Sequence, residues 1–141
     1  MPESLEGHVA LVTGGGSGVG ANIAIDLLVN NAGVQGELVT LDQEEPASWW
    51  QVFEINVRGV FLCCRAAVPG MLVRGGGRIV NITSGAAYLP PGGFPSTAYG
   101  PSKAAVHRFS ETLADQLSPR GVFVRKTCSH VRAVPPLLRN G

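Results

Sequence analysis

Three side chains in the second half of the sequence have the chemistry to move a proton to or from an alcohol oxygen. Tyr99 and Lys103 are four residues apart, and Ser84 precedes Tyr99 by fifteen residues. On a helix, residues with this four-residue spacing share a face, so the phenol and the ammonium group would stand side by side. An ammonium group close to a phenol stabilises the phenolate, and such a tyrosine can donate a proton to a carbonyl or accept one from an alcohol. The same spacing in an ordinary helix gives only a surface Tyr–Lys pair.

A glycine-rich segment near the start of the sequence indicates a site for a phosphate-bearing ligand. An apolar run, residues 8–12, leads into Thr13 and then into the segment Gly14-Gly15-Gly16-Ser17-Gly18-Val19-Gly20. Glycines let the backbone turn tightly and approach a pyrophosphate, which the amides at a helix N-terminus can bind. An isolated cluster of this kind can be a mere flexible loop, but one that directly follows a buried-type strand is moderately specific.

The motifs and their order resemble those of the short-chain dehydrogenase/reductase family. The sequence contains, in order, Thr13-Gly14-x-x-x-Gly18-x-Gly20, Asn30-Asn31-Ala32-Gly33, Asn56, Ser84 and Tyr99-x-x-x-Lys103. The resemblance extends from about Leu5 to Val124. It implies an oxidoreductase that interconverts a ketone and a secondary alcohol by hydride transfer, with NAD or NADP as the cofactor. The sequence does not indicate which of the two cofactors is preferred.

The resemblance also implies a role for each residue. Tyr99 would be the catalytic acid/base, Lys103 would stabilise the ionised tyrosine and hold the nicotinamide ribose, and Ser84 would bind the substrate oxygen. Asn56 would hold a water in the proton relay; a purely structural role, such as a bond to a backbone carbonyl, is the alternative. The implied cofactor-binding residues are Gly14, Ser17, Gly18, Val19, Gly20, Asn31, Ala32, Gly33, Tyr99 and Lys103.

The sequence departs from the family between the glycine-rich segment and Asn30. Nine residues separate Gly20 from Asn30, whereas the family has two further βα units there, roughly 60 residues at about 30 residues per unit. The residue that selects the adenosine ribose would belong to this missing part. Because parallel strands need a connection of about a dozen residues or more, we expect a strained or rearranged first crossover, with fast amide exchange across residues 14–30.

The alternation of apolar segments predicts one α/β domain over residues 1–141: a partial Rossmann-like, doubly wound parallel sheet of about four strands with flanking helices. The family resemblance identifies this unit as a truncated dinucleotide-binding domain that lacks the second and third strand units and the C-terminal substrate region. The predicted strands are residues 8–12, 26–29, 78–82 and 122–124; the predicted helices are 18–25, 47–73, with a break near Pro69-Gly70, and 96–117; polar or proline-rich connections are predicted over 35–46 and 88–95.

The helix predicted over residues 47–73 has two adjacent apolar stripes and should therefore be buried on two faces. In the family, this helix and the one over 96–117 form dimer contacts, so a homo-oligomer is one expectation; an intramolecular core is the other. Two functions follow from the whole pattern. One is an active NAD(P)-dependent oxidoreductase acting on a small alcohol or ketone, and the other is a catalytically silent fragment that binds related subunits.

Composition argues against several other classes of protein. The formal net charge of +1 provides no basic field for nucleic acid. No apolar run approaches the roughly 18 residues of a membrane span, and the first residues do not resemble a signal peptide, so we expect no membrane partner and a cytoplasmic location. The three cysteines, Cys63, Cys64 and Cys128, fit no zinc motif. We therefore expect reduced thiols and no metal site.

Overall fold

The computed structural model describes residues 7–13, 25–88 and 96–129. Within these ranges four strands form one parallel sheet in the order β1-β2-β3-β4. The strands are β1 (Ala10–Thr13), β2 (Leu27–Asn30), β3 (Gly77–Ser84) and β4 (Val122–Ser129), and the α-helices are α1 (Pro46–Phe53), α2 (Gly59–Val73) and α3 (Tyr99–Leu117). Short turns are η1 (Leu41–Gln43), the π-helical η2 (Glu54–Arg58), η3 (Gly85–Ala87) and η4 (Ser118–Arg120). The predicted α/β fold with a parallel sheet and flanking helices is confirmed.

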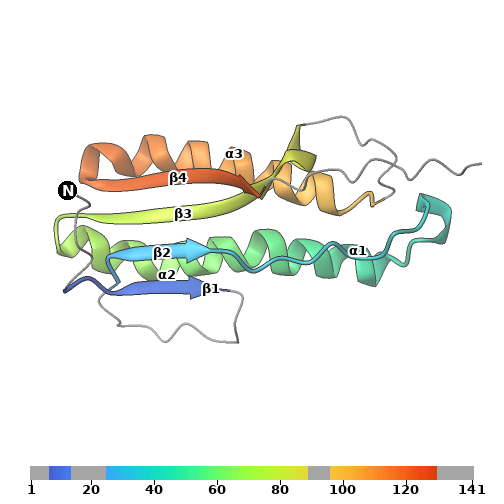
Figure 1. Cartoon of the computed structure of the whole chain (residues 1–141), viewed down its shortest axis with the longest axis horizontal. Helices are drawn as coiled ribbons and strands as arrows, with labels where there is room; N and C mark the ends of the chain where they lie inside the picture. Colours follow the sequence, from blue (N-terminus) through green and yellow to red (C-terminus); the bar gives the residue numbers. More distant parts are fainter. Residues whose placement is uncertain (1–6, 14–24, 89–95, 130–141) are drawn as a thin grey trace, which may run out of the picture.

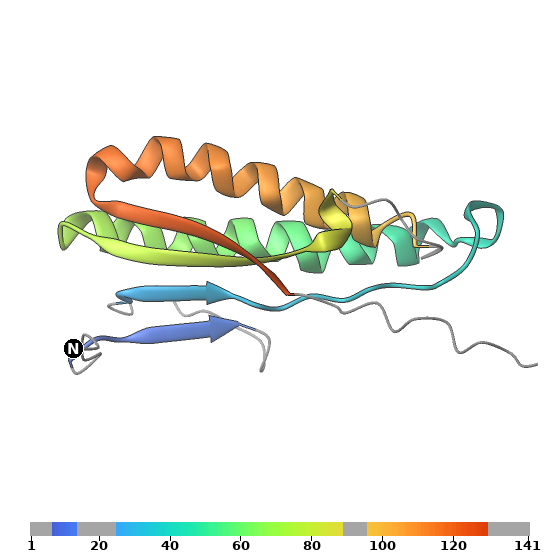
Figure 2. The same cartoon turned by 45° about the horizontal axis from the view of Figure 1, so that its top comes forward.

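The helices described here all lie on one side of the sheet. Figure 1 views the sheet from the opposite side, with α2 and α3 behind the strands, and the view in Figure 2 shows α3 running above β3 and β4. The core lies between the sheet and the helices. On the sheet side, the fully buried residues include Leu28 of β2, Ile79 of β3 and Val122 of β4, and on the helix side they include Met71 of α2 and Val106 of α3. All four strands point the same way, so their carboxyl ends gather at one edge, where α1 and α3 also begin (Figure 1).

Several predicted boundaries need correction. The helix over residues 47–73 does not break near Pro69: α1, η2 and α2 run as one helix from Pro46 to Val73. Proline removes the bond to the carbonyl of Arg65, but both residues are on the exposed side, where water can replace that bond. The helix predicted to start at Ser96 starts at Tyr99, because residues 97–98 form a turn and Ala98 is the N-cap. The Ser96 hydroxyl accepts the Tyr99 N–H at 3.1 Å.

The observed strand bounds differ less from the predicted ones, except for β4. β1 and β2 each lie slightly later than predicted, and β4 continues five residues beyond Val124, because its whole length pairs with β3. The predicted first crossover, its short helix and most of the loop over 88–95 lie outside the described residues.

The continuous helix Pro46–Val73 is, by length and composition, able to cross a membrane, with a mean hydropathy of 1.3 in its most apolar window. We had expected no such segment. One side of the helix packs on β2 and β3 through residues that include Val60, Cys64 and Met71. A core helix of an α/β domain passes the same test of length and composition, so this feature is weak evidence for a membrane span.

Replacing Gly121 by alanine should lower the free energy of unfolding by about 2 kcal/mol. Gly121 has φ of +83°, and an added Cβ would lie 2.8 Å from the carbonyl oxygen of Gly75. Gly75→Ala is the matched control, because Gly75 has φ of +82° but free space around the Cβ position, so its cost should be about 1 kcal/mol. Urea denaturation measures both. Equal losses of unfolding free energy in the two variants would show that the Gly75 carbonyl can move away from the added Cβ without cost.

Candidate active site

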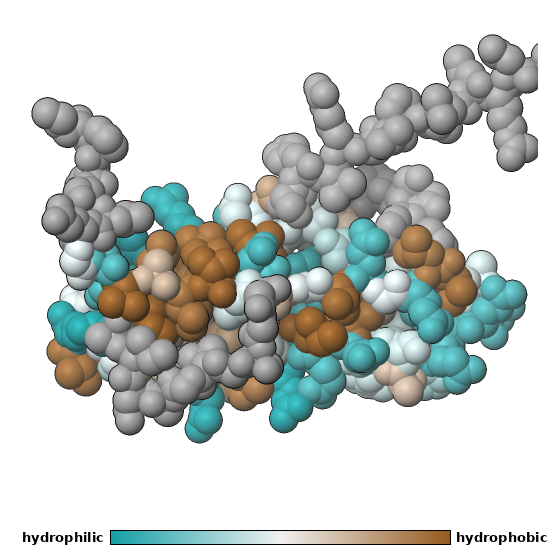
Figure 3. Space-filling view, turned by 60° about the horizontal axis from the view of Figure 1, so that its bottom comes forward, coloured by the Kyte–Doolittle hydropathy of each residue, from teal (hydrophilic) through white to brown (hydrophobic). Residues whose placement is uncertain are grey.

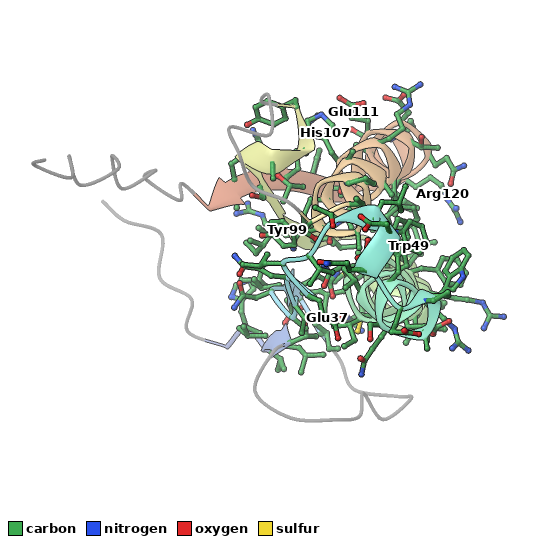
Figure 4. The ribbon with its side chains drawn as sticks, turned by 90° about the vertical axis from the view of Figure 1, so that its right-hand side faces the viewer. Glu37, Trp49, Tyr99, His107, Glu111 and Arg120 are labelled. Atoms are coloured by element: carbon green, nitrogen blue, oxygen red, sulfur yellow. The ribbon has the colours of Figure 1, made fainter. Side chains whose placement is uncertain are left out.

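The carboxyl ends of β2 and β3 and the first turn of α3 form the candidate site. Figure 4 looks at this edge of the sheet, with Tyr99 lying between the strands and the start of the helical layer. Ser84 is the last residue of β3, is buried, and its hydroxyl accepts the N–H of Ala86 at 3.3 Å. This turn lies against α3, because a Cβ on Gly100 would be 3.1 Å from the Ala86 carbonyl oxygen. Ser84 therefore lies at the same edge of the sheet as the start of the Tyr99 helix.

Lys103 is buried next to Tyr99, with only 5% of its surface exposed. Its Nζ donates a hydrogen bond to the Ile82 carbonyl at 3.1 Å and lies 5.9 Å from the centre of the Tyr99 ring. Burial lowers the pKa of Lys103 from its usual value, because desolvation disfavours the ammonium form. The β3 carbonyl thus holds the Lys103 amine beside the Tyr99 ring.

The segment that follows β2 passes directly over Lys103. A Cβ on Gly33 would lie 3.1 Å from Lys103 Nζ and 3.4 Å from Asn56 Oδ1, so a larger residue would displace one of these polar groups. The N–H groups of Asn31 and Ala32 donate to Thr13 Oγ1 at 3.2 and 3.4 Å. These bonds hold the segment against the end of β1.

Asn56 joins three parts of the site and is fully buried. Its Oδ1 accepts the Val34 N–H at 2.8 Å, and its Nδ2 donates to the Val34 carbonyl at 2.9 Å and to Ser102 Oγ at 3.0 Å. Ser102 Oγ in turn donates to the Tyr99 carbonyl at 2.7 Å. Asn56 lies in the π-helical turn η2, a type of irregularity that is frequent at functional sites. The Asn56 side chain thus bonds a backbone carbonyl, as in the structural alternative, and its place in a proton relay stays a prediction.

A chain of buried amides behind the site was not predicted. Asn30 Nδ2 donates to Asn81 Oδ1 at 2.8 Å, Asn81 Nδ2 donates to Ser110 Oγ at 2.9 Å, and Ser110 Oγ donates to the Val106 carbonyl at 2.7 Å. Asn30 and Asn81 are paired in the β2–β3 register. The sequence signal for this hydrogen-bonded network was an asparagine within each of two apolar strands, together with a serine on the apolar face of α3. Ser102, which bonds to Asn56, was likewise missed.

The structure brings together Asn56, Lys103, Tyr99 and Gly33, with Ser84, Asn31 and Ala32 at the same edge of the sheet. The other predicted cofactor residues, Gly14, Ser17, Gly18, Val19 and Gly20, lie outside the described ranges. Within those ranges, no group of three or more His, Cys, Asp or Glu side chains could hold a metal ion.

Comparison with known proteins identifies the family. The family profile described as short chain dehydrogenase matches residues 23–134. The chain belongs to the short chain dehydrogenase family. The match covers the chain from before β2 to beyond β4, and thus Asn31, Ala32, Gly33, Asn56, Ser84, Tyr99 and Lys103, whereas the glycine-rich segment precedes it.

Relatives of this family member include enzymes of several named specificities. The chain is 39% identical over 115 residues to the 2-(R)-hydroxypropyl-CoM dehydrogenase of Xanthobacter autotrophicus, covering 79% of this chain and 45% of that protein. It is 43% identical over 101 residues to the 3-oxoacyl-[acyl-carrier-protein] reductase of Synechocystis, covering 71% and 39%. A solved gluconate 5-dehydrogenase from Burkholderia cenocepacia, in complex with NADP and tartrate, is 32% identical with a TM-score of 0.68, covering 77% and 40%. The chain thus spans less than half of the length of each of these relatives.

Proposed function

We propose that this chain is an NAD(P)-dependent oxidoreductase that interconverts a ketone and a secondary alcohol, with Tyr99 as the acid/base. The observation that carries the proposal is the buried Lys103 ammonium group, held by the Ile82 carbonyl with its Nζ 5.9 Å from the centre of the Tyr99 ring. The names of the relatives support it, because those named above are dehydrogenases and a reductase, one of them solved with NADP. Small alcohols and ketones are the proposed substrates.

Each residue of the site has a defined task in this proposal. Ser84 and Tyr99 would hold the substrate oxygen, and the phenol would give its proton to that oxygen as the carbonyl carbon is reduced; in the oxidation direction the phenolate would accept it. Lys103 would place its positive charge beside this phenol. An ammonium group has three donors and one is used by Ile82, so others remain for ribose hydroxyls. The Asn56 side chain already bonds Val34 and Ser102, so a relay water would be held by the Asn56 backbone.

The residues that the structure describes fit the nicotinamide half of NAD or NADP, which would supply the hydride. The absence of a side chain on Gly33 leaves space beside Lys103 Nζ and Asn56 Oδ1, at the edge where ligands bind to open parallel sheets. The phosphates would be bound by the Gly14–Gly20 segment. The residue that selects the adenosine ribose has no counterpart in the sequence, because the second strand unit is missing.

Titration with NADH and NADPH tests the cofactor assignment. We expect dissociation constants on the order of 1 mM, about 4 kcal/mol of binding, with little discrimination, because only part of the nucleotide site is present. Gly33→Val should weaken both further, since its side chain would meet Lys103 and Asn56. Fluorescence of the bound nicotinamide provides the measurement. Tight binding of one cofactor alone would mean that another segment replaces the missing strand.

A specific surface favours a second candidate function, that of a catalytically silent fragment which binds related subunits. A groove of about 420 Å³ lies between the long helix and α3, with Trp50 61% and Phe61 46% exposed. Its lining is largely apolar but includes the Glu54–Arg58 ion pair. In this case the helices over 47–73 and 96–117 would form a homo-oligomer or pair with a longer relative. The residues that line the groove include Trp50, Phe53, Val57, Phe61, Val106 and Phe109.

Sedimentation and assay together separate the two candidates. Phe61→Glu should leave a monomeric enzyme active but should dissociate an oligomer that depends on the groove. The silent fragment would be supported if the chain binds neither NADH nor NADPH to saturation and forms an oligomer only when Phe61 is unchanged. We propose a cytoplasmic location for either function, because the three cysteines are free thiols and such thiols persist in reducing compartments.

A further inference from the structure

Tyr99 is the first residue of α3, and the first turn is where a helix holds its residues least firmly. The first N–H groups of a helix have no acceptor within it, and helix ends fray. The N-cap residue is Ala98, whose side chain has no oxygen to accept these groups. Lys103 lies one turn further into the helix. Fraying of the first turn would therefore move the Tyr99 phenol relative to Lys103 Nζ.

Two serine hydroxyls bind the main chain of Tyr99, one on each side. The Ser96 hydroxyl accepts the Tyr99 N–H at 3.1 Å and donates to the Gln35 carbonyl at 3.1 Å. The Ser102 hydroxyl donates to the Tyr99 carbonyl at 2.7 Å and accepts from Asn56 Nδ2 at 3.0 Å. Both serines are thus bound in turn to segments outside α3.

Thr97 makes a third attachment, to α1 and to the segment that precedes α1. Its hydroxyl accepts the Trp49 indole N–H at 3.1 Å and is hydrogen-bonded to the Glu44 carboxylate. A hydroxyl has one proton and two lone pairs, so donation to the carboxylate leaves a lone pair for the indole. The Trp49 ring stacks on Phe53, with the ring centroids 4.5 Å apart. The indole that binds Thr97 is therefore itself held in place.

The long helix formed by α1, η2 and α2 binds the start of α3 at two points. Trp49 and Asn56 are seven residues apart in this helix and so lie on the same face of it. Trp49 bonds Thr97 and Asn56 bonds Ser102, on either side of Tyr99 in the sequence. Figure 4 faces this end of the molecule and labels both Trp49 and Tyr99.

The segment that supplies Glu44 is not held by a core of its own. Each of residues 35–46 is exposed or half-buried. Figure 3 shows hydrophilic residues interspersed with apolar ones at the right-hand end of the molecule, where this segment lies. The hydrogen bonds of the segment to Ser96 and Thr97 therefore join it to the start of α3.

We propose that Thr97 is a positioning residue for Tyr99, and that its bonds to Trp49 and Glu44 hold the phenol in its reacting geometry. This inference rests on the proposed function, in which Tyr99 is the acid/base. A displacement of about 1 Å can cost a reaction about 100-fold in rate. Because such a displacement weakens the transition state more than the bound ground state, it lowers kcat and leaves KM nearly unchanged.

Replacement of Thr97 by valine keeps nearly the same shape and removes the hydroxyl. Reduction of cyclohexanone at saturating NADPH should lose about 10–100-fold in kcat, with the KM for the ketone within about twofold. Thr97→Ser keeps the hydroxyl and should restore most of the rate. Thr112→Val is the matched control, because Thr112 is exposed on α3 and its hydroxyl bonds the Arg108 carbonyl at 3.2 Å; its kcat should be unchanged.

The fluorine NMR spectrum of the full chain labelled with fluorotyrosine tests the positioning without turnover. The chain has two tyrosines, Tyr88 and Tyr99, and Tyr88→Phe assigns their signals. Thr97→Val should shift or broaden the Tyr99 signal and leave the Tyr88 signal in place, and Thr97→Ser should restore the spectrum. Trp49→Phe removes the indole N–H but keeps an aromatic ring, so it should reproduce the change even if Thr97→Val does not fold. Circular dichroism checks the folding of each variant.

The outcomes separate this inference from the proposed function. A chain without turnover whose Tyr99 signal responds to Thr97→Val would refute the proposed activity and support the positioning role. An active chain in which Thr97→Val lowers stability alone, with kcat and the Tyr99 signal unchanged, would overturn the positioning role. An equal loss of kcat in Thr97→Ser and Thr97→Val would also overturn it, as would a Tyr99 signal that neither Thr97→Val nor Trp49→Phe changes.

Discussion

The variant Tyr99→Phe should lose ketone reduction by about 10²–10⁴-fold, the usual contribution of a positioned acid/base. The change removes only the phenolic oxygen and keeps the ring, whose centre lies 5.9 Å from Lys103 Nζ. The fold should therefore persist while the proton donor is lost. Oxidation of NADPH or NADH in the presence of a panel of small ketones, followed at saturating cofactor, measures the loss.

The chain offers a matched control for this experiment, because it has only one other tyrosine, Tyr88. Its hydroxyl contacts Cys128 Sγ at 2.7 Å and its ring is 59% exposed. Tyr88→Phe should leave the rate within about twofold, because the lost hydroxyl contacts Cys128 and is not one of the proposed catalytic groups. If the two variants have equal rates, Tyr99 is not the acid/base.

Replacement of Asn81 by leucine should lower the free energy of unfolding by about 3 kcal/mol, the cost of leaving buried polar groups unpaired. Asn81 is fully buried and bonds both Asn30 and Ser110. Loss of the Asn81 side chain would leave Asn30 Nδ2 with only the weak acceptor Cys64 Sγ, at 3.4 Å. For a chain of this size the melting temperature should fall by about 10 °C. Thermal melting followed by circular dichroism makes the measurement.

The double variant Asn30→Leu/Asn81→Leu provides the control. Because it removes both amides, it should be less destabilised than the sum of the two single variants. A single-variant loss below about 0.5 kcal/mol, typical of surface positions, would show that the amides are solvated.

The fold was predictable because each strand and helix has a clear local pattern. The apolar segments around Leu28 and Ile79 lie between turns and polar connections, and the face of α3 that includes Val106 and Leu117 has helical spacing. The same argument fails at Pro69, because the helix continues through this proline. The freed Arg65 carbonyl lies on the exposed side of the helix, where water can bind it. The same argument also placed the start of α3 too early, because the hydroxyl of Ser96 binds the Tyr99 N–H from a turn that precedes the helix.

The site was predictable in part, because Tyr99 and Lys103 belong to one helix and their separation is set by its pitch. The partners of Asn56 were not predictable, since Val34 and Ser102 come from other segments and meet it only after packing. The alignment of Asn30 with Asn81 depends likewise on strand register, which the pattern of either strand alone leaves open. Buried side chains whose partners are distant in sequence are the part that sequence reasoning misses.

The all-parallel order of the strands has a consequence for synthesis on the ribosome. Leu27 has Arg78 as its neighbour in β3, and Gly77 has Val122 in β4, so neither pair can form as a local hairpin. Translation proceeds at about 5–20 residues per second. Several seconds therefore pass between the synthesis of Leu27–Asn30 and that of β3. During that interval the apolar strand is available to chaperones or to other nascent chains, and slower translation would lengthen its exposure.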